Sequence, residues 1–222
     1  MMKKIKEFIE KNAKIIEVLF SLISLIIVGI FGTTISINNS ITSRASLELS
    51  KANSQPIFNI KIASEAVGEE LSESISIEID SGFAENLSVN EYVFLTYNYE
   101  ENGENVEKKV SIDNYYLGTF YSGNNRGVVC TLKGFSNAQT LVNLQSEIVT
   151  HNLDKYKDLH KSVLIEVSYK DITGDSYLKY YENSGFTFNH LENEAGGNLV
   201  KEINEMPKIK LAELSIEKLE TL

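Results

Sequence analysis

The residues best equipped for chemistry lie close together in the second half of the chain. His151, Asp154, Asp158 and His160 offer nitrogen and oxygen atoms that could bind a metal ion. Their spacing matches neither HExxH nor another metal-binding motif, and charged residues are common on surfaces. We therefore expect a solvated connection between a helix and a strand, with no metal, cofactor or catalytic residue. A hydrolase that uses these four residues is the one enzymatic alternative.

Two other reactive or acidic features have simpler explanations. Cys130 is the only cysteine and alternates with Val128 and Leu132, which predicts a buried thiol on one face of a strand. Seven carboxylates between Glu65 and Glu85 could supply oxygen ligands to calcium, but no Asp/Asn loop with a central glycine organises them. We interpret them as a solubilising acidic face.

The eleven tyrosines are candidates for binding. The pairs Tyr115-Tyr116 and Tyr180-Tyr181 are expected on strands, where neighbouring side chains point to opposite faces, so one ring of each pair should be exposed. Exposed rings suit contact with a sugar or a peptide. Aromatic residues also favour strands for packing alone, and we prefer that explanation.

The charge pattern argues against nucleic acid as a partner. The chain holds 21 Lys and Arg against 31 Asp and Glu, a net charge of −10, and no strand or helix face gathers basic residues. Such a surface repels a phosphate backbone. With 42% hydrophobic and 23% charged residues, the composition is that of a globular protein.

Residues 18–37 contain no charged side chain. A helix of this length spans about 30 Å, the thickness of the hydrocarbon layer of a bilayer. A cleaved signal peptide would have a shorter apolar core and an A-x-A-like site, which the following residues lack. We therefore predict a retained transmembrane helix in the lipid bilayer; a cleaved signal and a buried soluble helix are the alternatives.

Residues 1–17 predict the orientation of that span. They hold five lysines, whereas the fifteen residues after Ile37 hold only Arg44 and Lys51. Because lysine-rich flanks stay in the cytoplasm, we expect the N-terminus inside the cell and the rest of the chain outside the membrane.

Small residues recur along one face of the span, namely Gly29, Gly32, Thr33 and Ser36. Such a face lets a second helix approach closely, so the span could pair two copies of the chain. The simpler explanation is that small residues are common in membrane helices. Residues 38–55 continue a helical pattern up to Pro56, which predicts a helical stalk.

Residues 56–188 alternate apolar and polar positions with period two, the pattern of half-buried strands. Asn102-Gly103 separates two such runs and suits a hairpin turn. About eight short strands predict an antiparallel β-sandwich or a small barrel. Apolar residues at helical spacing predict one helix inserted within residues 136–151.

Residues 189–222 follow the β domain. Residues 189–197 are polar and contain Gly196-Gly197, which predicts a mobile link. After Pro207, four apolar residues share one helical face, which predicts an amphipathic C-terminal helix. They are Ile209, Ala212, Ile216 and Leu219.

Together these features predict a single-pass, non-enzymatic membrane protein that displays an acidic β domain outside the cytoplasmic membrane. The domain would bind a protein or glycan partner, or associate with a second copy. The alternative is a sensor or effector whose β domain faces the cytoplasm and binds a small ligand. The layout is common among anchored bacterial proteins and by itself specifies no activity.

Overall fold

The computed structural model describes residues 2, 11, 13–68, 70–101, 104–151, 153, 156–185 and 187–222. The chain forms two compact units, Met1–Ala52 and Asn53–Leu222. The described residues of the first unit are helical, and the described strands all lie in the second.

Helix α2 (Ala13–Ser54) makes up most of the first unit and ends two residues before Pro56. Proline disfavours helical geometry in the residue before it, which accounts for this end. The predicted span, residues 18–37, lies in α2, but most of its side chains, like most of residues 1–17, lie outside the described part of the chain. Among the described residues, no helix is long and apolar enough to cross a membrane. The anchor and the stalk remain predictions.

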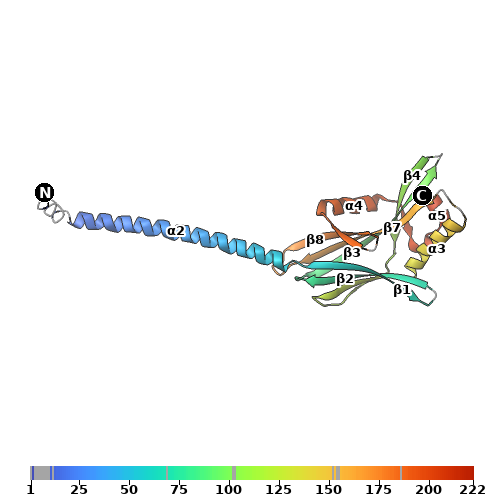
Figure 1. Ribbon diagram of the computed structural model, residues 1–222, viewed down its shortest axis with the longest axis horizontal. Coiled ribbons are helices and arrows are strands. Elements are labelled where there is room, and N and C mark those ends of the chain that lie inside the picture. The colour runs from blue at the N-terminus through green and yellow to red at the C-terminus, as the bar shows by residue number, and fades with distance from the viewer. Residues whose placement is uncertain are drawn as a thin grey trace. The chain divides into compact units, whose positions relative to one another are not determined.

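The second unit is built on one sheet with the strand order β10-β4-β3-β7-β8-β9-β1-β2-β6-β5 (Figure 1). Its strands are β1 (Ile57–Val67), β2 (Glu70–Ser81), β3 (Glu85–Glu101), β4 (Glu104–Asp113), β5 (Gly118–Tyr121), β6 (Gly127–Lys133), β7 (Tyr156–Lys170), β8 (Ser176–Ser184), β9 (Thr187–Leu191) and β10 (Lys208–Lys210). The described pairs are antiparallel except for β10 with β4, which run parallel. The predicted turn Asn102-Gly103, between β3 and β4, lies outside the described residues.

The sheet curls into a half-barrel. β9 pairs along its length with β8 and meets β1 at Lys61 and Thr187, so it joins one lobe (β10 to β9) to the other (β1 to β5). Among the described residues, this pair is the only strand pairing between the lobes. Our prediction of a mainly β fold with an inserted helix is confirmed. We predicted an antiparallel sandwich or a small barrel, whereas the structure has one mixed sheet curled into a half-barrel, because β9 joins the lobes and β10 adds a parallel edge.

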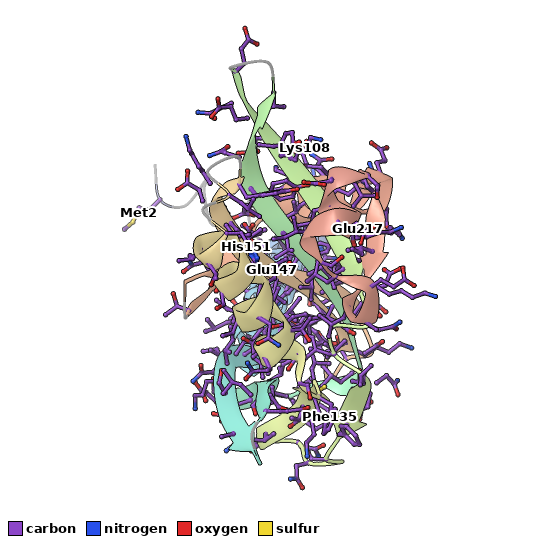
Figure 2. The ribbon with its side chains drawn as sticks, turned by 90° about the vertical axis from the view of Figure 1, so that its right-hand side faces the viewer. Met2, Lys108, Phe135, Glu147, His151 and Glu217 are labelled. Carbon is purple, nitrogen blue, oxygen red and sulfur yellow. The ribbon has the colours of Figure 1, made fainter. Side chains whose placement is uncertain are left out.

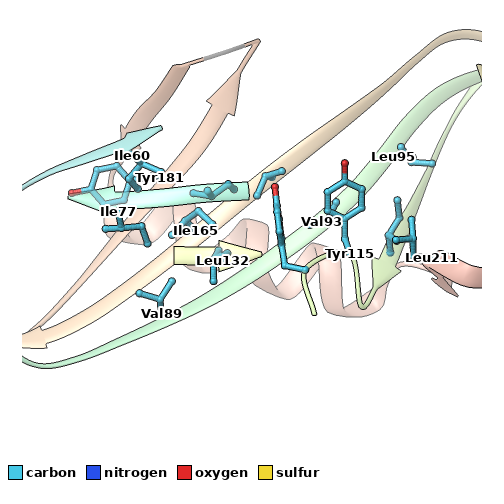
Figure 3. Close-up of a cluster of buried hydrophobic side chains, with 14 of the residues drawn as sticks. Ile60, Ile77, Val89, Val93, Leu95, Tyr115, Leu132, Ile165, Tyr181 and Leu211 are labelled. Carbon is cyan, nitrogen blue, oxygen red and sulfur yellow. The ribbon is translucent and has the colours of Figure 1, made fainter. Parts of the chain in front are cut away.

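The concave face of the half-barrel holds the main hydrophobic core (Figure 3). Alternate strand residues point into it, as the period-two pattern predicts. The inserted helix α3 (Asn137–Thr150), the 3-10 turn η1 (Leu211–Glu213) and helix α5 (Ile216–Glu220) also contribute buried side chains. The fully buried aliphatic residues include Ile75, Ile77, Leu95, Leu132 and Ile165.

Helix α4 (Asn193–Glu205) covers part of the opposite, convex face over β3 and β8 (Figure 1). A second cluster lies between them: Phe94, Leu164, Tyr180, Ile203 and Met206. The predicted mobile link around Gly196-Gly197 is therefore wrong. A Cβ atom on Gly196 would lie 2.2 Å from the ring of Tyr180, so the glycine allows close packing whose energy outweighs its low helix propensity.

The segment after Pro207 is also not the single helix that we predicted. It forms β10, η1 and α5 in turn, and the backbone N–H of Ser111 donates to the carbonyl oxygen of Pro207 at 2.9 Å. Pairing in β10 satisfies backbone groups at the edge of β4, which would lack a strand partner there if this segment were a helix. Of the four residues predicted to share an apolar face, Ile209, Ile216 and Leu219 are nevertheless buried, whereas Ala212 is exposed and its neighbour Leu211 is buried instead.

Candidate functional site

The N-terminal half of β3 lacks a strand neighbour on one side. β3 pairs with β7 from Glu85 to Tyr99, but its pairing with β4 begins only at Phe94. For residues 85–93, the described part of the chain supplies no strand on the β4 side. A row of backbone N–H and C=O groups therefore faces an opening in the half-barrel.

β5 forms the last edge of the same sheet. It pairs with β6 and, among the described strands, with no other. Its sequence, Gly-Thr-Phe-Tyr, carries no charge, and the side chains of Leu117, Phe120 and Tyr121 are 65%, 56% and 49% exposed. An uncharged edge strand with exposed apolar side chains is a template for pairing with another chain.

One hydrogen bond joins these two edges. The backbone N–H of Val89 in β3 donates to the hydroxyl oxygen of Tyr121 in β5 at 3.0 Å. We name the opening between residues 85–93 and residues 113–125 the seam. The Tyr121 hydroxyl occupies the position that a carbonyl oxygen of a neighbouring strand would take.

Two hollows lie along the seam. The first, of about 360 Å³, is lined by Asn86, Leu87, Tyr121 and Asn124, among others. The second, of about 210 Å³, is lined by residues that include Glu91, Val93, Asp113, Tyr115 and Lys208. Each hollow takes wall residues from both sides of the opening, one toward each end of the seam.

Glu91 is the charged side chain most enclosed by the seam. It alternates with Val89 and Val93 along β3 and so shares the face that points into the core. Burial raises the pKa of its carboxyl above the ordinary value. Within the described part of the chain, no Lys, Arg or His forms an ion pair with Glu91.

A buried ion pair holds one wall of the seam in place. Lys161 of β7 and Glu73 of β2 form a salt bridge, with side chains that are only 13% and 11% exposed. The hydroxyl of Tyr116 donates to Oε1 of the same carboxylate at 2.6 Å, and Nζ of Lys161 donates to the hydroxyl of Tyr115 at 3.3 Å. The wall between β4 and β5 is thus fixed to β2 and β7.

The electrostatics of this cluster follow from its burial. Burial lowers the pKa of Lys161, while the charge of Glu73 acts in the opposite direction. Burial, and then the charge of Glu73, raise the pKa values of Tyr115 and Tyr116. Nζ of Lys161 also lies 4.7 Å from the centroid of the Tyr115 ring, a cation-π contact. The four side chains stabilise one another and leave Lys161 engaged rather than free for nucleophilic chemistry.

Helix α3 is attached to the same strand. Oδ1 of Asn137 accepts from the backbone N–H of Glu73 at 2.7 Å, and its Nδ2 donates to the carbonyl oxygen of Glu73 at 3.2 Å. Ser136, which precedes the helix, has φ 53° and provides no side-chain cap. The Asn137 side chain binds the backbone of the neighbouring strand as a further strand would.

Among the residues that the sequence singled out, the described ones, His151, Asp158 and His160, do not form a metal site. His151 lies at the end of α3, where its Nδ1 is 3.0 Å from the carbonyl oxygen of Glu147 (Figure 2). His160 lies in β7 with its Nδ1 2.8 Å from the carbonyl oxygen of Asp158, and Asp154 lies outside the described residues. Of the described side chains, no three metal-ligating groups come together.

Other predicted features are placed as follows. Cys130 is fully buried, as we predicted, and burial raises the pKa of its thiol to about 11. In α2, Thr33 and Ser36 are exposed, whereas the surroundings of Gly29 and Gly32 lie outside the described part of the chain. The helix-packing face stays a prediction.

The expectation of half-exposed tyrosine pairs is wrong. All four rings are buried. Tyr115 and Tyr116 lie in the turn after β4, folded over the concave face, and not on a strand. Tyr180 points to the convex face but lies beneath α4, while Tyr181 points into the core.

Sequence reasoning missed both carboxylates of the site, although a signal was present. Glu73 is in phase with Ile75, Ile77 and Ile79, and Glu91 is in phase with Val93. A charged residue at a core-facing position of an alternating strand indicates a buried partner or a binding site.

Comparison with known proteins adds no family: no protein-family model, no curated protein and no solved structure matches this chain.

Proposed function

We propose that the β domain binds an extended segment of a partner protein, which adds as a strand to the seam. We further propose that the N-terminal helix tethers this domain to the outer face of the cytoplasmic membrane. The observation that carries the first proposal is the edge of β3 at residues 85–93, which has no strand partner on its β4 side among the described residues and is interrupted by one bulge at Asn86 and Leu87.

Strand addition suits the chemistry of this opening. Main-chain hydrogen bonds supply affinity, and pockets for alternate side chains supply specificity. Leu87 and Val93 line the hollows on the β3 side, and Tyr121 lines the first hollow on the β5 side. An incoming strand would place alternate side chains in the hollows and could also cover the exposed ring of Phe120.

The fixed wall also supports a binding role. The Glu73 and Lys161 pair holds Tyr115 and Tyr116 in one arrangement before a partner arrives. A preorganised surface loses less conformational entropy on binding, so more of the contact energy appears as affinity.

A peptide with an altered backbone tests strand addition. The probe is a nine-residue peptide of alternating Val and Thr, offered to the full-length chain in mild detergent, and its twin carries N-methyl groups on alternate backbone nitrogens. The two share all side chains, but the twin cannot donate along one edge. We expect hydrogen exchange to slow at residues 85–93 with the first peptide only. Equal binding of both peptides, or protection elsewhere alone, would contradict strand addition.

The tether rests on the uncharged residues 18–37 and the lysines of residues 1–17. Substitution Glu104→Cys places a thiol on the exposed end of the β3-β4 hairpin. We expect a membrane-impermeant maleimide to label this variant in intact cells, and the protein to stay with membranes after alkaline extraction. The wild-type chain is the control, because its single thiol, Cys130, is buried. Labelling only after lysis would reverse the predicted topology.

A further inference from the structure

We infer that the strand received by the seam is basic, and that it places a Lys or Arg side chain against the carboxylate of Glu91. This inference rests on the proposed strand addition and names the chemistry of the partner. Its basis is the contrast between the two carboxylates on the concave face of the sheet near the seam.

Glu73 and Glu91 occupy comparable positions but differ in their partners. Each sits at a core-facing position of its strand. Glu73 has the ammonium of Lys161 and the hydroxyl of Tyr116 as partners. Glu91 forms no ion pair among the described residues, although burial raises its pKa and Lys208 lines the same hollow. An enclosed carboxylate without a counter-charge is unfavourable, and a cation supplied by a partner would remove this cost.

The position of Glu91 makes it reachable from a bound strand. It lies on the unpaired part of β3 and lines the second hollow of the seam. A residue placed directly opposite Glu91 in an added strand points to the same face, about 5 Å away at Cβ. An opposite charge is the favoured cross-strand partner at that distance.

The surrounding charge favours the same partner. Residues 53–222 carry 14 Lys and Arg against 27 Asp and Glu, a net charge of −13. In the second hollow, Glu91 and Asp113 outnumber the single ammonium of Lys208. A second copy of this chain would bring the same negative excess, so electrostatics oppose self-association at the seam and attract a basic segment.

Three peptides that differ at one position test the inference. Each is Val-Thr-X-Thr-Val-Thr-Val-Thr-Val, with X as Lys, Gln or Glu. When the peptide pairs antiparallel with β3 and its first residue lies opposite Val93, X lies opposite Glu91. Affinities are measured for the full-length chain in mild detergent at low salt. We expect the Lys peptide to bind about tenfold more tightly than the Gln peptide, and the Glu peptide to bind most weakly.

Variants of the chain assign the preference to one residue. Glu91→Gln should reduce the preference for Lys over Gln to about twofold, and Glu91→Lys should shift it to the Glu peptide. Glu104→Gln, at the exposed end of the β3-β4 hairpin, removes the same charge from the domain and should leave the preference intact. Near-UV circular dichroism confirms that each variant is folded.

The outcomes separate the two proposals. If all three peptides bind equally well, or if the Lys preference survives in Glu91→Gln, the basic strand at Glu91 is refuted while strand addition stands. If no peptide binds and residues 85–93 gain no protection, strand addition fails, and this inference fails with it.

Discussion

Removing one member of the Glu73 and Lys161 pair should destabilise the β domain strongly. Lys161→Met leaves the Glu73 carboxylate buried with Tyr116 as its remaining side-chain donor, and Glu73→Gln leaves the Lys161 ammonium without a counter-charge. Breaking a buried pair in this way costs about 3–5 kcal/mol. Because both side chains keep about a tenth of their exposure, we expect the lower end, about 3 kcal/mol for each single substitution.

The double substitution is the sharper test. Glu73→Gln with Lys161→Met leaves neither charge unpaired, and the amide can still accept from the hydroxyl of Tyr116. We expect it to cost about 3 kcal/mol in total, about 3 kcal/mol less than the sum of the single substitutions. Such a coupling energy is the signature of a pair that acts as a unit.

The chain offers a clean assay for this experiment. It contains no tryptophan, and its eleven tyrosines all lie between Tyr92 and Tyr181, within the β domain. Near-UV circular dichroism in the tyrosine band therefore follows unfolding of that domain in urea without a tyrosine signal from α2. A loss of 3 kcal/mol lowers the urea midpoint by about 1–2 M, given the usual slope for a domain of this size.

An exposed pair provides the matched control. Nζ of Lys61 lies 2.6 Å from a carboxylate oxygen of Glu78, with side chains 54% and 21% exposed. Lys61→Met should cost less than about 1 kcal/mol, because solvent screens the pair. If Lys161→Met costs no more than Lys61→Met, the cluster does not fix the wall of the seam and the argument for preorganisation is refuted.

Three further predictions follow from single contacts. Gly196→Ala should destabilise the domain by about 1–3 kcal/mol, because the new Cβ atom meets the ring of Tyr180. Gly197→Ala should be neutral or stabilising by up to about 1 kcal/mol, because the nearest atom lies 4.0 Å from its Cβ position. Equal effects of the two substitutions on urea unfolding would contradict this prediction. Burial raises the pKa of the Cys130 thiol from 9.0 to about 11, so its contribution to the free energy of unfolding is full below pH 9 and is lost as the pH rises toward 11. At pH 8 the thiol should react with a disulfide reagent only when the domain unfolds. Rapid labelling of the folded chain would argue against burial. Tyr121→Phe removes the hydroxyl that accepts from Val89, so peptides should bind the seam about two- to tenfold more tightly; weaker binding would show that the Tyr121 hydroxyl contacts the peptide instead of competing with it.

The strands were the part of the fold that the sequence predicted best. Ile75, Ile77 and Ile79 alternate strictly, and β2 buries all three. Period two is a local property of a strand, so it survives any arrangement of the sheet. The bridging role of β9 is not local, since it depends on where Thr187 falls relative to Lys61, and no pattern within either strand encodes that pairing.

The errors share a physical cause, which is burial supplied by distant segments. The period of β8 correctly sends Tyr180 and Tyr181 to opposite faces, but α4 covers the face that was expected to be exposed. The Gly196-Gly197 pair resembles a link until the ring of Tyr180 is placed against it. Tertiary packing overrides local propensity in both cases.

The candidate site was only partly accessible from the sequence. Glu73 and Glu91 are in phase with core residues, so the alternation alone flags them. The open edge of β3 has no such signal, because it depends on β4 ending at Asp113 while β3 continues back to Glu85. An edge is a property of the sheet as a whole.

The narrow connection at Lys61 and Thr187 affects how the domain deforms. Within each lobe the strands are joined by long ladders, but between the lobes the described backbone pairing is a single residue pair. It is assisted by Nζ of Lys179, which donates to the carbonyl oxygen of Pro56 at 3.1 Å. A hollow of about 540 Å³ beside it, lined by Phe58, Tyr181 and Phe188 among others, leaves room for movement. Bending is cheapest where the fewest contacts must change. Bending the half-barrel would therefore change the fewest backbone pairs at this joint, but it would also have to strain the core that both lobes share and the Glu73 and Lys161 pair that joins them.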